Sequence, residues 1–94
     1  MKATEIQFAL NLKALSVPQC RRIVEALFRC SHTQDELSNV CKLSPASIEK
    51  HLNILEEGGL VKVRINKGVR KIEIDKSKIQ PSIDWFSMLK NNLS

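Results

Sequence analysis

Positively charged side chains that can bind phosphate are the most prominent chemical groups in this chain. Residues 58–80 contain seven Lys or Arg and two Asp or Glu, and this local charge of +5 equals the net charge of all 94 residues. Because Lys and Arg neutralise the phosphates of nucleic acids, the concentration favours a polyanionic partner. A second interpretation stays open, since a charged and solvated face also keeps edge strands from aggregating.

Acidic residues dominate the stretch that precedes it. Residues 33–57 contain five Asp or Glu against two Lys. Part of this excess suits the first turn of a helix, where the helix dipole favours negative charge. Glu49 lies further along, and its carboxylate repels phosphate but can accept a hydrogen bond from cytosine N4. Glu49 therefore either reads a DNA base or weakens DNA binding, and both interpretations stay open.

Motifs for catalysis are absent from the sequence. It contains no glycine-rich phosphate loop and no nucleophile motif, and each of its three glycines fits a helix end or a turn. We therefore expect neither an enzyme nor a bound cofactor.

The cysteines are too few for a disulfide framework or a zinc site. Cys20, Cys30 and Cys41 are an odd number, which suits reduced thiols in a reducing compartment. A zinc ion needs about four converging ligands, whereas Cys30, His32 and Cys41 offer three at loose spacing. We expect no metal, and a thiol redox response, through Cys30 with Cys41 or between subunits, remains an alternative.

Length and patterning predict one soluble domain that covers residues 1–94. Hydrophobic residues make up 43% of the chain, which excludes a disordered tail. No apolar run exceeds three residues, so we find no candidate membrane span or signal-peptide core. The expected location is the cytoplasm.

Apolar periodicity predicts four consecutive helices, two of which begin at explicit capping signals. Thr33 and Glu36 form a capping box. Ser44 is a typical N-cap, and Pro45 suits the first helical position. The expected helices cover residues 4–15, 18–30, a short segment from residue 33, and about 45–57, where Gly58 and Gly59 end the last of them.

The apolar period then changes to two residues, which indicates β-strands. Residues 60–75 alternate in this way around Asn66-Lys67-Gly68, which predicts a hairpin with a three-residue turn and a bulge. Pro81 predicts the start of a last helix over residues 81–93. The expected fold class is mainly α with one β-hairpin, in the order α-α-α-α-β-β-α.

A short helix, a tight turn, a second helix and a hairpin are the components of a winged helix-turn-helix. The second helix of such a unit presents its N-terminal side chains to base edges in the major groove, and a basic hairpin beside it contacts phosphates or the minor groove. Residues 45–57 would be the recognition helix and residues 60–75 the wing. The residues expected to contact DNA are Ser44, Ala46, Ser47, Glu49, Lys50, His51, Asn53, Arg64, Lys67 and Arg70.

Two segments resemble the recognition helix and wing entry of ArsR-type winged-helix repressors. They are residues 43–52, Leu-Ser-Pro-Ala-Ser-Ile-Glu-Lys-His-Leu, and residues 55–61, Leu-Glu-Glu-Gly-Gly-Leu-Val. Residues 18–24 resemble the start of that family's second helix, and residues 83–86 resemble its C-terminal dimerisation helix. The resemblance implies a dimeric, DNA-binding transcriptional repressor. Glu49 stands where the family has a small hydroxyl residue, and the Cys-x-Cys cluster of the family's third helix is absent.

The first and last predicted helices, residues 4–15 and 81–93, carry an extensive apolar surface. The last helix could close the core, or both helices could form the seam of a homodimer, which is the interpretation that we favour. The residues expected at that seam are Phe8, Leu12, Ile83, Trp85, Phe86 and Leu89.

Taken together, these patterns predict a sequence-specific DNA-binding transcriptional regulator that acts as a dimeric repressor. Its partners would be double-stranded DNA and a second copy of the chain, with no membrane partner and an unknown inducer. The alternatives are a winged-helix module that binds proteins without strong DNA binding, and a regulator that responds to thiol oxidation.

Overall fold

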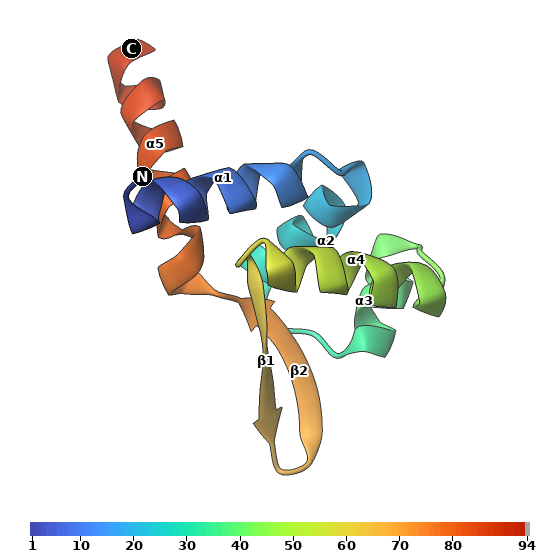
Figure 1. Ribbon diagram of the computed structural model, residues 1–94. Helices are drawn as coiled ribbons and strands as arrows, with labels where there is room; N and C mark the ends of the chain where they lie inside the picture. Colours follow the sequence, from blue (N-terminus) through green and yellow to red (C-terminus); the bar gives the residue numbers. More distant parts are fainter. Residues whose placement is uncertain (94) are drawn as a thin grey trace.

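A computed structural model describes residues 1–93 and shows a winged helix-turn-helix with five helices and one β-hairpin (Figure 1). The predicted order of elements is confirmed. The domain measures 41 × 24 × 20 Å. Its elements are α1 (Ala3–Leu15), α2 (Pro18–Arg29), α3 (Gln34–Cys41), α4 (Pro45–Glu57), β1 (Val61–Asn66), β2 (Val69–Ile74) and α5 (Lys76–Leu93).

The hydrophobic core lies between α2, α3, α4 and the base of the hairpin. Its side chains without solvent exposure include Ile23, Leu37, Ile48, Leu55 and Leu60. Together with further buried residues, such as Leu27 in α2 and Leu52 in α4, they form one buried face of each of these two helices, as an amphipathic helix of a globular domain requires. Burying such a side chain contributes about 1.5–3 kcal/mol. This core fixes α4 against α2 and α3, so the outer face of α4 has a defined orientation.

Two helices begin at the caps that the sequence predicts. The Thr33 hydroxyl accepts a hydrogen bond from the Glu36 amide at 3.1 Å, and the Glu36 carboxylate accepts one from the Thr33 amide at 2.7 Å. These bonds lower the pKa of the Glu36 carboxyl group. The Ser44 hydroxyl accepts from the Ser47 amide at 3.1 Å, with Pro45 at the first position of α4.

The hairpin turn is shorter than predicted. Asn66 pairs with Val69, so the turn consists of the two residues Lys67 and Gly68, and the register from Val61 to Asn66 contains no bulge. Both turn residues have positive φ, 52° for Lys67 and 78° for Gly68. Such a two-residue turn matches the twist of the strands without an extra residue. The prediction of a three-residue turn with a bulge is therefore wrong.

The base of the hairpin is attached to the segment between α2 and α3. His32 pairs with Ile72 in antiparallel fashion, through backbone hydrogen bonds of 3.0 Å and 2.7 Å. This pairing adds a short third member beside β2. It ties the wing to the residue that immediately precedes the capping box of α3.

The last helix begins five residues earlier than Pro81 predicts. The Asp75 carboxylate accepts hydrogen bonds from the Ser77 hydroxyl at 3.0 Å and from the Lys78 amide at 3.3 Å, and α5 begins at Lys76. Asp75 therefore acts as the cap. Pro81 lies inside the helix, so its prediction as the first residue is wrong.

The terminal helices meet the end of α4 at a buried polar joint, beside the core contacts of Ala14 and Ile79. Asn11 has no solvent exposure, donates to the Gly58 carbonyl at 2.7 Å and accepts from the Ser82 hydroxyl at 2.7 Å. Gln7 donates to the same carbonyl at 3.1 Å. A Cβ at Gly58 would approach the Ala14 Cβ to 2.6 Å, so the close approach of α1 requires glycine there. One side chain thus connects α1, the end of α4 and α5.

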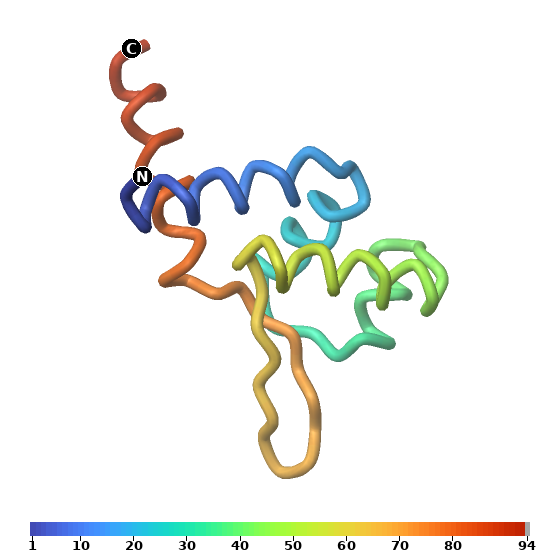
Figure 2. The backbone as a smooth tube through the Cα atoms, viewed as in Figure 1, coloured from blue at the N-terminus to red at the C-terminus, as the bar shows by residue number. Residues whose placement is uncertain are grey.

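The path of the chain places its two ends on one side of the domain (Figure 2). The first turn of α1 lies beside α5, whose C-terminal half extends past the remaining helices, while the hairpin projects from the opposite end. Within residues 1–93, no helix combines the length and the apolarity that crossing a membrane requires.

Candidate nucleic-acid interface

The first turns of α4 present small and polar side chains to solvent. Ile48, Leu52 and Leu55 face the core. The opposite face holds most of the predicted DNA-contacting residues of this helix. Ser44, Ala46, Glu49, Lys50 and Asn53 are exposed, and Ser47 is half-buried.

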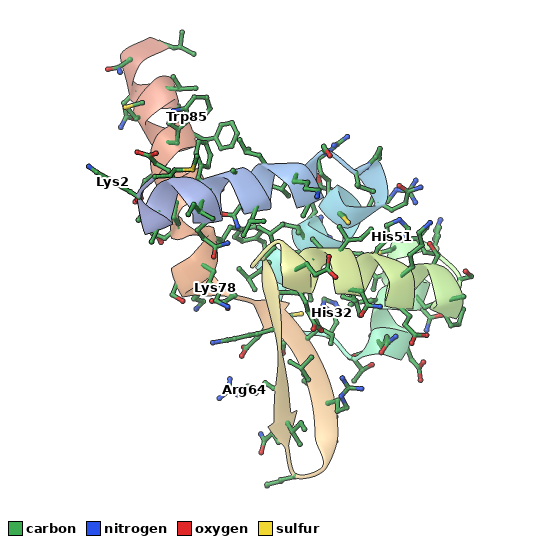
Figure 3. All side chains as sticks on the ribbon, in the orientation of Figure 1. Lys2, His32, His51, Arg64, Lys78 and Trp85 are labelled. Atoms are coloured by element: carbon green, nitrogen blue, oxygen red, sulfur yellow. The ribbon has the colours of Figure 1, made fainter. Side chains whose placement is uncertain are left out.

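His51 lies on the inner face of α4 rather than the outer one. Its side chain is 7% exposed, and its Nδ1 atom lies 2.6 Å from the Ser47 carbonyl and 3.3 Å from the Ser47 hydroxyl. In Figure 3, His51 lies on the side of α4 that faces α2. The ring is enclosed by the helix and the core behind it, so the structure argues against the predicted DNA contact of His51.

The hairpin has one charged face and one face that continues the core. Lys62 lies opposite Glu73, and Arg64 lies opposite Lys71. Arg64 also approaches Glu73, with 3.7 Å between Nη1 and Oε2. Figure 3 shows Arg64 extending from β1 away from α3 and α4. As an exposed ion pair this contact contributes little stability. It leaves Arg64 as the least well placed of the three predicted wing contacts.

The other two wing cations lie at the tip. Lys67 occupies the turn and Arg70 follows it, and both are exposed. Their neighbour Ile65 is 68% exposed, although it continues the apolar face of β1. The tip therefore combines positive charge with one exposed aliphatic side chain, a surface that suits the phosphate-lined walls of a nucleic-acid groove.

The wing tip and the start of α4 lie at separate points. The C-terminal end of α4 leads into β1, whereas its first turn points to the other side of the domain (Figure 1). A helix of 13 residues is about 20 Å long, so these two parts reach a partner at positions well apart. They would contact different parts of one duplex.

Lys42 is an exposed cation that sequence reasoning did not single out. It ends α3 in the left-handed conformation, with φ of 55°, two residues before Ser44. Glycine is the usual residue at such a position, so no local pattern marks a lysine there as the link between the two helices. Its place beside the cap of α4 adds positive charge to the start of that helix.

The cysteines differ in accessibility. Cys20 and Cys41 are buried, and this burial raises the pKa of both thiols, although nearby Arg22 partly counteracts the effect at Cys41. Cys30 is exposed, with its sulfur 3.9 Å from His32 Nε2. Among residues 1–93, no three His, Cys, Asp or Glu side chains converge as a metal site would require.

The predicted seam residues lie on an exposed apolar surface of α1 and α5. Trp85 packs against Phe8 with the two rings tilted by 45° and their centroids 5.3 Å apart, and it contacts Phe86 edge-on with centroids 5.1 Å apart. Trp85 is 40% exposed and Leu89 is 38% exposed, and Leu12, Ile83 and Phe86 are exposed to a similar extent. Phe8 is half-buried. We call these six residues the seam surface.

Comparison with known proteins identifies the domain. The family described as "Bacterial regulatory protein, arsR family" matches residues 18–63. Residues 18–63 thus resemble an ArsR-family domain. The match runs from the first residue of α2 to Val63 in β1. It therefore contains the helix-turn-helix and the first half of β1.

Solved structures extend the likeness of the ArsR-family domain to most of the chain. An ArsR-like transcriptional regulator from Rhodococcus sp. RHA1 is 21% identical with a TM-score of 0.80, over 98% of this chain and 87% of that one. A homodimeric winged helix-turn-helix DNA-binding domain from Mycobacterium bovis is 18% identical with a TM-score of 0.75, over 95% and 82%. HlyU from Vibrio cholerae N16961 is 22% identical with a TM-score of 0.74, over 95% and 97%. At these identities the likeness establishes the fold. No curated protein matches the sequence.

Proposed function

We propose that this protein is a sequence-specific DNA-binding transcriptional regulator that works as a dimeric repressor in the cytoplasm. The observation that carries the proposal is the outer face of α4: its first turns are exposed, capped and free of large apolar side chains, while the core holds the opposite face rigidly. A helix of this kind fits the major groove with its N-terminal residues at the base edges. The ArsR-family domain over residues 18–63 supports the same function.

In this proposal, one group of residues contacts the DNA bases and a second group contacts the phosphates. Contacts to bases come from Ala46, Ser47, Glu49, Lys50 and Asn53, with Ser44 at the start of the helix. Contacts to phosphates come from Lys67 and Arg70 at the wing tip, with Arg64 in a lesser role because it approaches Glu73. Glu49 has no opposite charge within ion-pair distance among the described residues, so its carboxylate is available to accept from cytosine.

Dimerisation is the second part of the proposal. The seam surface is apolar and exposed on two adjacent helices, and a DNA-binding domain of similar fold from Mycobacterium bovis is homodimeric. Two copies related by a two-fold axis would present two α4 helices and two wings to one duplex.

A salt series with duplex DNA tests the proposal. Four to six phosphate contacts should give a slope of about −4 to −5 in log K against log salt concentration. Exchanging Lys67 and Arg70 for Glu should weaken binding to all sequences, because both side chains contact phosphate. Glu49→Ala should change which sequence is preferred, because it removes a base contact. Binding measured by fluorescence anisotropy on selected and random duplexes separates these effects.

The control exchanges Lys2 and Lys90, at the far ends of α1 and α5, for Glu. It changes the net charge by the same amount as the wing variant. Equal losses in the two variants, or a flat salt dependence in the wild type, would support a winged-helix module that binds another protein.

A further inference from the structure

A groove between α1 and α5 is separate from the proposed DNA contacts and from most of the seam surface. It is a shallow depression, open to solvent, with a volume of about 590 Å³. Phe8, Pro81, Trp85 and Met88 form its apolar walls, and Glu5 and Asp84 add one carboxylate from each helix. Figure 3 labels Trp85 where α5 passes α1. The groove therefore has aromatic walls and two negatively charged carboxylates.

The charge of this groove is opposite to that of the chain. None of its lining residues is Lys or Arg, although the chain contains 15 of them. Gln80 donates to the Asp84 carboxylate at 2.7 Å, which holds that group at the edge of the groove. A polyanion gains nothing from such a site. A cation gains from both carboxylates and from the faces of the aromatic rings.

The aromatic wall is held in place before any ligand arrives. Trp85 contacts Phe8 on one side and Phe86 on the other, with ring centroids 5.3 Å and 5.1 Å apart. A fixed ring loses little conformational freedom when a ligand packs on it. The walls also suit bulky apolar groups better than a small, hydrated metal ion, because carbon atoms cannot replace its water ligands.

The groove and the seam surface occupy different faces of α5. Successive residues are about 100° apart around a helix, so Asp84 and Phe86 point about 160° apart. Asp84 and Met88 belong to the groove face, whereas Phe86 and Leu89 belong to the seam surface. Trp85 lies between the two faces. A ligand in the groove would therefore contact an edge of the seam without having to displace a second copy.

We propose that this groove binds a lipophilic organic cation, meaning a ligand with aromatic or bulky aliphatic groups around one positive charge. The apolar groups lie against Phe8, Pro81 and Trp85, and the charge lies near Glu5 and Asp84. The inference goes beyond DNA binding and does not depend on it. Because Trp85 and Phe8 also belong to the seam surface, an occupied groove changes the packing at its edge.

Tetraphenylphosphonium is a suitable probe, because tetraphenylborate has the same shape and the opposite charge. Trp85 is the single tryptophan of the chain, so its fluorescence reports directly on the groove. Titration of the full-length protein with the phosphonium ion should give a saturable change in this fluorescence. The borate ion should change it less at every concentration.

Removing the carboxylates tests the electrostatic part. The double variant Glu5→Gln with Asp84→Asn should bind the phosphonium ion about fivefold to tenfold more weakly, since two partly exposed charge contacts are lost. The matched control, Glu25→Gln with Glu56→Gln, changes the net charge equally on the exposed faces of α2 and α4 and should bind as the wild type does. Circular dichroism confirms that both variants fold.

Three outcomes would overturn the inference. The first is a wild-type fluorescence that does not saturate with the phosphonium ion, and the second is equal weakening in the two double variants. The third is an apparent affinity that falls as the protein concentration rises, because it would mean that a second copy fills the groove. DNA binding can succeed or fail in any of these cases, so the two proposals are tested separately.

Discussion

The helix-turn-helix half of the molecule and the terminal helices differ in how far their large apolar side chains are buried. In α2, α3 and α4 the regularly spaced Ile and Leu residues are buried, and charged residues face solvent. In α1 and α5 the large apolar residues Leu12, Trp85 and Phe86 are exposed. The contact of these helices with the rest of the domain combines the polar pair Asn11 and Ser82 with the buried Ala14 and Ile79. The three helices of the first half leave only Phe28 and Val40 exposed among their large apolar residues in the described part of the chain. An exposed apolar surface as extensive as that of the second half often marks a region that binds a partner.

The same substitution in the two halves should give the largest contrast. Leu55 has no solvent exposure, so Leu55→Ala should lower the free energy of unfolding by about 2–5 kcal/mol through lost burial and a residual cavity. Leu89 is already partly exposed, so Leu89→Ala should change the stability of the monomer by less than about 1 kcal/mol. Urea denaturation at low protein concentration measures both. Combined with Trp85→Ala, Leu89→Ala should instead convert dimers to monomers in sedimentation velocity.

The difference between the two halves would be disproved if Leu89→Ala lowered the free energy of unfolding of the monomer as much as Leu55→Ala does. That result would mean that the end of α5 belongs to the core of a single copy. If the double variant at Trp85 and Leu89 remains a dimer, the seam lies on another surface.

Because the joint between α1, α4 and α5 is polar, we expect a more hydrophobic residue at its centre to lower the stability of the fold. Asn11→Leu has nearly the same size but leaves the Ser82 hydroxyl without its acceptor and removes one donor to the Gly58 carbonyl. Leaving such buried groups unbonded should cost about 1–3 kcal/mol. Leu12→Ala, one position along, should cost less than about 0.5 kcal/mol in the monomer because Leu12 is exposed. Thermal unfolding shows which of the two variants is less stable. If Asn11→Leu is more stable than the wild type, the hydrogen bonds of Asn11 do not stabilise the fold.

The smallest expected effects concern the capping box at the start of the helix-turn-helix. Thr33→Ala should cost about 1 kcal/mol, the usual value of an N-cap. The pKa of Glu36 is lowered in the folded state, so its carboxylate stabilises the fold above the pKa of the unfolded chain, and this stabilisation is lost as the pH falls through the folded pKa. Glu36→Gln keeps an acceptor but cannot titrate. The stability of wild type relative to Glu36→Gln should therefore decrease on acidification, as followed by urea unfolding at several pH values, and a constant difference would contradict this role.

Local signals account for what the sequence predicted correctly about the fold. The starts of α3 and α4 depend on residues three positions apart, Thr33 with Glu36 and Ser44 with Ser47, so a short window contains the whole interaction. The start of α5 was misplaced because Pro81 is an equally local signal that competes with Asp75. Proline tolerates the first turn of a helix, but that preference does not require a helix to start there.

Distant partners explain what sequence reasoning missed. The partners of Asn11 are Gly58 and Ser82, 47 and 71 positions away, so no spacing rule reveals that a polar residue is buried on α1. The DNA contact predicted for His51 follows from the resemblance to the ArsR-type recognition helix, whereas the rotation of His51 about the helix places it beside Leu52 and Leu55 in the interior. The outer residues of α4 were predicted from the same periodicity, and the structure leaves them exposed. Their contacts with DNA remain a prediction.

The pairing of His32 with Ile72 anchors the base of the wing to the segment before α3, while the tip of the wing has no such anchor. The tip, with Lys67 and Arg70, projects beyond this pairing, and His32 itself lies directly before Thr33. If the tip binds a duplex, a displacement of the tip would reach the start of α3 through this pairing. The same two hydrogen bonds thus connect the wing to the segment that leads into α3.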